Sequence, residues 1–211
     1  MGEAKGLIIT AAVTLLILIG GVILLSKGGT AKPTPVDSSF LVKSDSHQTN
    51  PGAKVTVVEF GDYECPACGA AYPITKQVLS TYGSQINFVF RNFPLPQHKN
   101  APMAAEAAEA ANAQGKFWEM HDKLYDTQND WADLDNPFNT FVGYAKDLGL
   151  NTDQFKSDVQ GNKYANVIST DTNDGNAIGI NATPTFYVNG IALSGVPSFD
   201  DFKSAIDPLL K

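Results

Sequence analysis

The fold of this chain is decided by the stretch Val55–Cys68, which reads VTVVEFGDYECPAC. Its first half is rich in β-branched and apolar residues, as a strand buried on both faces of a sheet would be. Its second half contains the only two cysteines of the 211 residues, Cys65 and Cys68, in the spacing C-x-x-C. The residues over 67–82 predict a helix that ends before Gly83. A strand followed by C-x-x-C at the head of a helix is typical of a redox-active thiol pair.

The position of the two cysteines also predicts their roles. A helix N-terminus presents unpaired N–H groups and the positive end of the helix dipole, which stabilise the thiolate of Cys65. The thiolate is the nucleophile of thiol–disulfide exchange, so we expect Cys65 to attack and Cys68 to resolve the mixed disulfide. A structural crosslink and half of a zinc site are the alternatives. A crosslink over two residues closes almost no loop, and zinc usually needs four ligands, so both are disfavoured.

The composition bounds the class of protein. A hydrophobic content of 43% supports one globular core. The net charge of −7 and the isoelectric point near 4.8 argue against nucleic-acid binding, which needs a basic face. The acidic excess is expected to serve solubility.

The N-terminal region differs from the rest. After a short segment over 1–6, an uncharged apolar run over 7–25 is long enough to cross a bilayer as a helix. A cleaved signal peptide is the alternative, because small residues over 29–31 offer a cleavage site. The length favours an uncleaved transmembrane anchor. We therefore expect a single-pass cell-membrane protein with its N-terminus in the cytoplasm and its catalytic domain outside, at the cell exterior or in the periplasm, where a disulfide persists.

Residues 26–51 are rich in Gly, Pro, Ser and Thr, which predicts a flexible tether. Within it, Phe40–Val42 is expected to add a short edge strand. The globular domain is expected over 52–211.

Periodicity predicts the remaining elements. Strands are expected over 55–61 and 86–91, and a hairpin over 185–193 is expected to turn at Asn189-Gly190 in a type I′ geometry. The region of about 100–179 carries helical signals and almost no strand signal. One helix is expected to begin at Asn100. Others are expected over 116–127, 136–147, 151–159, 163–178 and 198–210.

Two further features point to the site. Glu59 lies in an otherwise apolar strand, where a carboxylate is costly unless it faces solvent on an edge or has a function. The functional alternative is a buried acid with a raised pKa that relays protons to Cys68. Thr183-Pro184 opens a strand. Pro184 is either an ordinary loop proline or a cis-proline whose preceding residue, Thr183, offers its backbone groups to an extended peptide.

Four motifs together resemble the DsbA-type thioredoxin domain, in particular its membrane-tethered bacterial members. They are FGDYECPAC over 60–68, FRNFPL over 90–95, FWEMH over 117–121 and GINATPTF over 179–186. The resemblance covers about 52–211. C-x-x-C alone is moderately specific, whereas its combination with Thr-Pro beyond a helical insertion is highly specific.

The resemblance implies an α/β thioredoxin fold with a helical insertion domain over about 100–179, preceded by one N-terminal transmembrane helix. It implies Cys65 as the exposed attacking thiolate, Cys68 as the resolving thiol and Glu59 as the buried acid. The substrate-binding residues are expected to be Tyr63, Pro66, Ala67, Thr183 and the cis-proline Pro184. Tyr63 has a second interpretation, in which it only covers the edge of the sheet.

The resemblance also implies a protein disulfide oxidoreductase with no cofactor beyond its own disulfide. Its expected partners are unfolded or partly folded cysteine-containing proteins and a membrane quinone-linked reoxidase, and the protein is expected to be a monomer. Strong oxidases of this type carry histidine between the cysteines, where this chain has Ala67. Donation of the disulfide is the leading interpretation, and disulfide reduction or isomerisation is the alternative.

A different class remains open, namely a tethered metal-binding or copper-delivery protein that uses both cysteines and a histidine. Metal chaperones of this fold typically use the wider C-x-x-x-C, and the chain has no Met- or His-rich tract. No metal site is therefore expected. A substrate-binding module with incidental cysteines is a third, weaker hypothesis. His98 and His121 are expected to be structural, and Phe117 and Trp118 to lie in the core.

Overall fold

The computed structural model describes residues 34–211. The anchor or signal peptide expected over 7–25 lies outside these residues, as does the first part of the tether. Within 34–211, no helix combines the length and the apolar character that crossing a bilayer requires.

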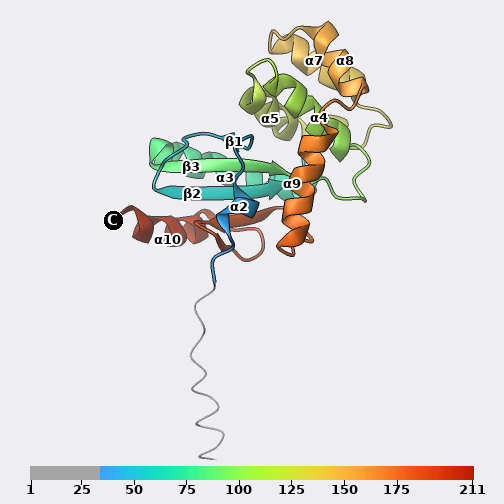
Figure 1. Cartoon of the computed structure of the whole chain (residues 1–211). Coiled ribbons are helices and arrows are strands. Elements are labelled where there is room, and N and C mark those ends of the chain that lie inside the picture. Colours follow the sequence, from blue (N-terminus) through green and yellow to red (C-terminus); the bar gives the residue numbers. More distant parts are fainter. Residues whose placement is uncertain (1–33) are drawn as a thin grey trace, which may run out of the picture. The chain divides into compact units, whose positions relative to one another are not determined.

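A mixed sheet of five strands, in the order β1-β3-β2-β4-β5, forms the centre of the domain (Figure 1). β2 and β3 are parallel, and the remaining neighbours are antiparallel. The parallel pair needs a crossover, which the helix after the C-x-x-C motif supplies. The strands are β1 (His47–Gln48), β2 (Val55–Gly61), β3 (Ile86–Asn92), β4 (Thr185–Val188) and β5 (Ile191–Ala192).

Helices cover both faces of the sheet. α3 (Pro66–Tyr82), followed by the 3-10 turn η1 (Gly83–Gln85), and α10 (Phe199–Leu210) pack on one face, and α2 (Ser38–Leu41) and α9 (Ala165–Ala177) pack on the other. The remaining helices contact mainly one another and are grouped to one side of the sheet (Figure 1). They are α4 (Ala101–Asn112), α5 (Phe117–Asp126), α6 (Gln128–Trp131), α7 (Phe138–Asp147) and α8 (Thr152–Gln160).

Alternation along β2 divides the core in two and decides where Glu59 points. Val58 and Phe60 belong to the apolar cluster that includes Leu41 of α2. Val55 and Val57 belong to the larger cluster, which includes residues of α3 and α10. Because side chains of a strand alternate between its faces, Glu59 shares the face of Val57, beneath α3.

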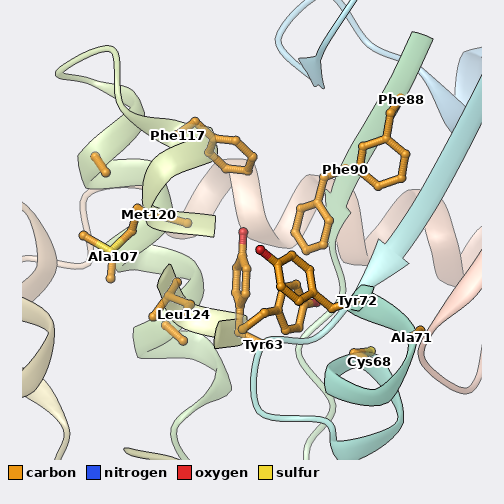
Figure 2. Packing of buried hydrophobic residues seen from close by; sticks show 14 of the residues in the cluster. Tyr63, Cys68, Ala71, Tyr72, Phe88, Phe90, Ala107, Phe117, Met120 and Leu124 are labelled. Carbon is orange, nitrogen blue, oxygen red and sulfur yellow. The ribbon is translucent and has the colours of Figure 1, made fainter. Parts of the chain in front are cut away.

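The helices α4–α8 pack around the alanines of α4, and their buried side chains belong to the same large cluster as Val55 and Val57. Ala104, Ala107 and Ala108 have no exposed surface, and such small side chains let α5 approach closely. Met120 and Leu124 of α5 fill the space beside them (Figure 2). Phe117 is also buried and Trp118 packs against this core, as expected from the sequence.

The segment before β2 differs from the expectation. Phe40 belongs to the helical turn α2, because Asp37 accepts a hydrogen bond from the N–H of Ser39 and Leu41 is buried. The edge strand is β1 instead, at His47–Gln48. The packed domain therefore begins near Pro35 rather than Gly52, and only part of the expected tether lies outside it.

The hairpin prediction is confirmed. Asn189 and Gly190 both have positive φ, 45° and 84°, as a type I′ turn requires. The side-chain oxygen of Asn189 also accepts a hydrogen bond from the N–H of Thr56, at 2.7 Å. The turn is thereby fixed to β2, which carries the site at its other end.

Candidate active site

A short loop connects β2 to the cysteines. The carboxylate of Asp62 accepts the N–H of Glu64 at 2.8 Å, and its carbonyl accepts the N–H of Cys65 at 3.1 Å. Cys65 is the N-cap of α3, and Pro66 occupies the first turn, where its missing N–H has no cost. The loop thus places the first sulfur at the positive end of the helix, as the sequence predicted.

The two cysteines are free thiols with different surroundings. Cys68 has no exposed surface, whereas Cys65 is 6% exposed. The attacking sulfur is therefore more enclosed than the exposed thiolate that the resemblance implied. The Cys65 sulfur lies 3.3 Å from the carbonyl oxygen of Thr183, which accepts a hydrogen bond from the protonated thiol.

The pKa values of the two thiols move in opposite directions. A hydrogen bond from the Cys68 thiol is the main cause that lowers the pKa of Cys65 to about 5, and the N–H groups of Cys68 and Ala67 add to it. Burial raises the pKa of Cys68 well above its ordinary value, and the neighbouring charges of Glu59 and Cys65 raise it further. At neutral pH the reduced pair therefore holds a Cys65 thiolate and a protonated Cys68.

The predicted cis-proline is confirmed, because the Thr183–Pro184 bond is cis. Thr183 is 7% exposed, and its carbonyl faces Cys65 although 118 residues separate the two. Pro66 is exposed and Ala67 is half-buried. Pro66 and Ala67 thus follow Cys65 directly in the chain and the Thr183 carbonyl lies opposite its sulfur, whereas Pro184 itself is buried; peptide binding by these residues stays a prediction.

Glu59 is 3% exposed, and burial raises its pKa to about 8. Its side chain lies on the face of β2 beneath α3, the helix that carries Cys68, and its negative charge, when ionised, raises the pKa of Cys68. Glu59 is therefore a buried and mostly protonated acid at neutral pH, and its part in proton transfer stays a prediction.

Tyr63 does not line an exposed groove. It is 1% exposed and belongs to an aromatic cluster, with ring centroids 5.1 Å from Phe90, 5.0 Å from Tyr125 and 5.7 Å from His121. Figure 2 shows its ring between Phe90 and the helices of the insertion. A tyrosine ring buries a large apolar surface, so packing in the core rather than contact with a substrate determines the position of Tyr63. His121, 2% exposed, belongs to the same cluster.

Two residues contact the active-site loop in a way that was not predicted from the sequence. The Gln128 amide of α6 donates hydrogen bonds to the carbonyls of Tyr63 and Cys65, at 2.7 and 2.9 Å. His98, from the loop between β3 and α4, lies 2.7 Å from Asp62 through its Nδ1. A lone glutamine in a four-residue helix and a lone histidine in a loop carry no sequence signal for these contacts.

No group of three or more His, Cys, Asp or Glu side chains in the part of the chain that the structure describes is arranged to hold a metal ion.

A low-pKa thiol at a helix N-terminus, a buried partner thiol and a neighbouring cis-proline together define a thiol–disulfide oxidoreductase. The comparisons agree with this class. The family model described as Thioredoxin matches residues 42–208, and the chain belongs to this family.

Solved structures of the same architecture include disulfide-exchange proteins. BdbD from Bacillus subtilis, in its oxidised form, is 25% identical with a TM-score of 0.72, over 86% of this chain and 99% of that one. A thioredoxin-like oxidoreductase from Silicibacter pomeroyi is also 25% identical, with a TM-score of 0.69, over 82% of this chain and 97% of that one. α-DsbA1 from Wolbachia pipientis is 20% identical, with a TM-score of 0.72 over 81% of this chain and 93% of that one. At this identity the likeness shows the fold alone.

Curated relatives carry a different name. A protein named Na(+)/H(+) antiporter NhaA 1 from Salinispora arenicola is 39% identical over 155 residues, which are 73% of this chain and 23% of that protein. One of the same name from Mycolicibacterium gilvum is 35% identical over 191 residues, 86% of this chain and 30% of that protein. The chain therefore spans less than a third of the length of these relatives.

Proposed function

We propose that this protein oxidises folding extracytoplasmic proteins by donating its Cys65–Cys68 disulfide to them. The low pKa of Cys65, about 5, carries the proposal. A thiol that ionises readily is a good leaving group, and its stable thiolate favours the reduced form of the protein. A disulfide whose reduced form is stabilised is an oxidant.

The exchange proceeds in two steps. A substrate thiolate attacks the Cys65 sulfur of the disulfide, forming a mixed disulfide and releasing Cys68 as a thiolate. A second substrate thiolate then attacks the substrate sulfur of the mixed disulfide, which forms the substrate disulfide and releases the Cys65 thiolate. The substrate loses two electrons and two protons: the pair of cysteines gains both electrons, Cys68 ends with one proton, and the other proton goes to solvent because Cys65 stays a thiolate.

The Cys68 leaving group requires a proton, because burial makes its thiolate costly. Glu59 holds a proton at neutral pH and lies near this sulfur. We propose that Glu59 supplies the proton when the mixed disulfide forms. In the reverse direction the same carboxylate accepts it.

Reduction or isomerisation of disulfides is the second candidate, and Ala67 favours it. A histidine at this position of the motif would add a positive charge beside the thiolate, and Ala67 supplies only its backbone N–H. Fewer groups that stabilise the thiolate make a weaker oxidant.

We propose further that the substrates are unfolded or partly folded proteins with cysteines and that a quinone-linked membrane protein reoxidises the monomeric domain. The apolar run over 7–25 supports a single-pass anchor with the catalytic domain outside the cytoplasm. The relatives named antiporters, which contain a similar region, support a place at the membrane. N-terminal sequencing of protein from the membrane fraction tests the anchor, and a soluble mature chain that begins near Lys32 would contradict it.

The direction of exchange is tested by mixing the oxidised protein with an equimolar reduced, unfolded protein whose native state contains disulfides. We expect disulfides to appear in the substrate while Cys65 and Cys68 become reduced, as measured by thiol trapping and mass spectrometry. If Cys65 and Cys68 instead stay oxidised while the substrate stays reduced at equilibrium, the protein is a reductase.

Two matched variants complete the experiment. Cys68→Ala lacks the resolving thiol, so its Cys65 should accumulate as a mixed disulfide with glutathione or substrate. Cys65→Ala should form no mixed disulfide near neutral pH, because the remaining Cys68 is buried and protonated.

A further inference from the structure

An ion pair not anticipated from the sequence lies beside the cysteines. The Nδ1 atom of His98 is 2.7 Å from Oδ2 of Asp62. The side chain of Asp62 has no exposed surface, whereas that of His98 is 17% exposed. A buried carboxylate is costly unless it is paired, so the histidine compensates Asp62.

The pair is held rigidly against the backbone of the active-site loop. Besides His98, Asp62 accepts hydrogen bonds from the N–H groups of Glu64 and Leu95, both at 2.8 Å. The N–H of His98 donates to the carbonyl of Leu95 at 3.0 Å, and the N–H of Cys65 donates to the carbonyl of Asp62 at 3.1 Å. Asp62 therefore connects His98 directly to the residue that carries the reactive sulfur.

The charge of His98 decides what this pair does to Cys65. With a neutral His98, the Asp62 carboxylate alone would oppose a thiolate at the neighbouring sulfur. With a protonated His98, the carboxylate is neutralised and the imidazolium attracts the thiolate. The charged groups around His98 are Asp62, Glu64 and Cys65.

These neighbours favour the protonated form. Burial alone would lower the pKa of His98, but the hydrogen bond and the charge of Asp62, with the charges of Cys65 and Glu64, raise it above its ordinary value. The contribution from Cys65 means that the imidazole lies within electrostatic reach of the sulfur.

We propose that His98, held by Asp62, is a positioning residue that provides a positive charge near the Cys65 thiolate. Within the motif itself no side chain provides such a charge, because Ala67 stands between the cysteines. The charge comes from the β3–α4 loop, across the site from the helix. It acts together with the Cys68 hydrogen bond and the helix N-terminus. Only its consequence for oxidising power rests on the proposed function.

The first test needs no variant of the active protein. Coupling between two groups is reciprocal, so a thiolate that is stabilised by His98 must raise the pKa of His98 by the same free energy. We expect the pKa of His98 in the full chain, measured by NMR titration, to be higher in the reduced protein than in the oxidised one by about half a unit or more. Equal values in the two redox states would overturn the proposal.

The signals of the three histidines are assigned in the wild-type protein by correlating each imidazole with its own backbone. His121, whose Nδ1 bonds Asp122 rather than a group of the site, is the internal control.

The second test measures the thiolate itself. In His98→Gln we expect the pKa of Cys65, followed by thiolate absorbance, to rise by about half a unit, the same coupling seen from the other group. At pH 7 such a rise destabilises the reduced form about threefold, which equals about 15 mV in the reduction potential. His98→Lys keeps a positive charge and should retain most of the wild-type value, which a merely structural role of the imidazole would not predict.

An unchanged Cys65 pKa in a folded His98→Gln protein would contradict the proposal, and if this variant does not fold, the titration of the wild-type protein decides. Both measurements are independent of the direction in which the protein exchanges disulfides. If the protein proves to be a reductase, the coupling between His98 and Cys65 is still expected.

Discussion

At the scale of single residues, the site depends on three groups whose surroundings move their pKa values apart. Hydrogen bonds lower the pKa of Cys65, and burial raises those of Cys68 and Glu59. One sulfur is thereby charged and ready to leave, while the other holds its proton and has an acid beside it. Because their pKa values are separated, one group can act as an acid and another as a base at the same pH.

Glu59→Gln is predicted to slow disulfide exchange by about a hundredfold, the lower end of the range for loss of a general acid. In the wild-type protein, the rate constant of mixed-disulfide formation, expressed per substrate thiolate, should fall as the pH rises through about 8, because Glu59 then loses the proton that it donates. The glutamine has no such proton, so this dependence should disappear. Stopped-flow measurement with a reduced peptide, over pH 6 to 9, checks both effects.

Glu106→Gln is the matched control, since Glu106 is an equally buried acid of α4 outside the site. Its exchange rates should equal those of the wild-type protein. Identical rates for Glu59→Gln and the wild-type protein at every pH would remove Glu59 from the mechanism.

The residues of the site were predictable to different degrees. Cys65, Cys68 and Pro184 lie in motifs, and their spacing from strands and helices suffices to place them. Tyr63 was misplaced because an aromatic residue next to a motif suits a groove and a core equally well. His98 gave no signal, since its role depends on Asp62, which lies 36 residues away along the chain.

At the scale of elements, the short helix α6 fixes the active-site loop to the helical insertion. Gln128 donates to two carbonyls of that loop and also lies against Gly69 of α3, where a Cβ atom would collide with its side chain. The helical insertion therefore does more than cover the sheet: it holds the start of α3 in place.

Gln128→Ala is predicted to lower the free energy of unfolding by about 1–3 kcal/mol, because it leaves the buried carbonyl of Tyr63 without a donor and that of Cys65 with only the N–H of Gly69. Urea unfolding measures the loss. Gln77→Ala, in an exposed position of α3, is the control and should change stability by less than about 0.5 kcal/mol. Equal stabilities of the two variants would show that the two hydrogen bonds contribute nothing.

The elements themselves followed the sequence where periodicity was strong. β2, β3 and the hairpin of β4 and β5 lie where β-branched residues and the Asn-Gly turn predicted them. α2 and β1 did not, because tertiary contacts decide them: His47 of β1 is held by Glu109 at 2.8 Å and stacks on Phe117. Such contacts between distant residues leave no local pattern in the sequence.

At the scale of the whole domain, ionisation of the site is coupled to folding. The pKa of Cys65 falls from 9.0 to about 5 on folding, so the reduced protein gains stability as the pH rises from about 5 to about 9. The pKa of Glu59 rises from 4.5 to about 8, so stability is lost as the pH rises through that range. Because burial alone causes the Glu59 shift, this loss applies to both redox states.

The oxidised protein has no Cys65 thiolate, so its stability should only fall between pH 5 and pH 8. In the reduced protein the two effects oppose each other, and its stability should change little. The difference in the free energy of unfolding between the reduced and the oxidised protein should therefore grow by up to about 1.4 kcal/mol per pH unit, the free energy that corresponds to one pKa unit. Urea unfolding of both forms at pH 5, 6, 7 and 8 measures it.

Cys65→Ser cannot form the thiolate and should follow the slope of the oxidised protein. Parallel curves for the reduced and oxidised proteins would mean that Cys65 is not ionised in the folded state, and the basis for disulfide donation would be lost.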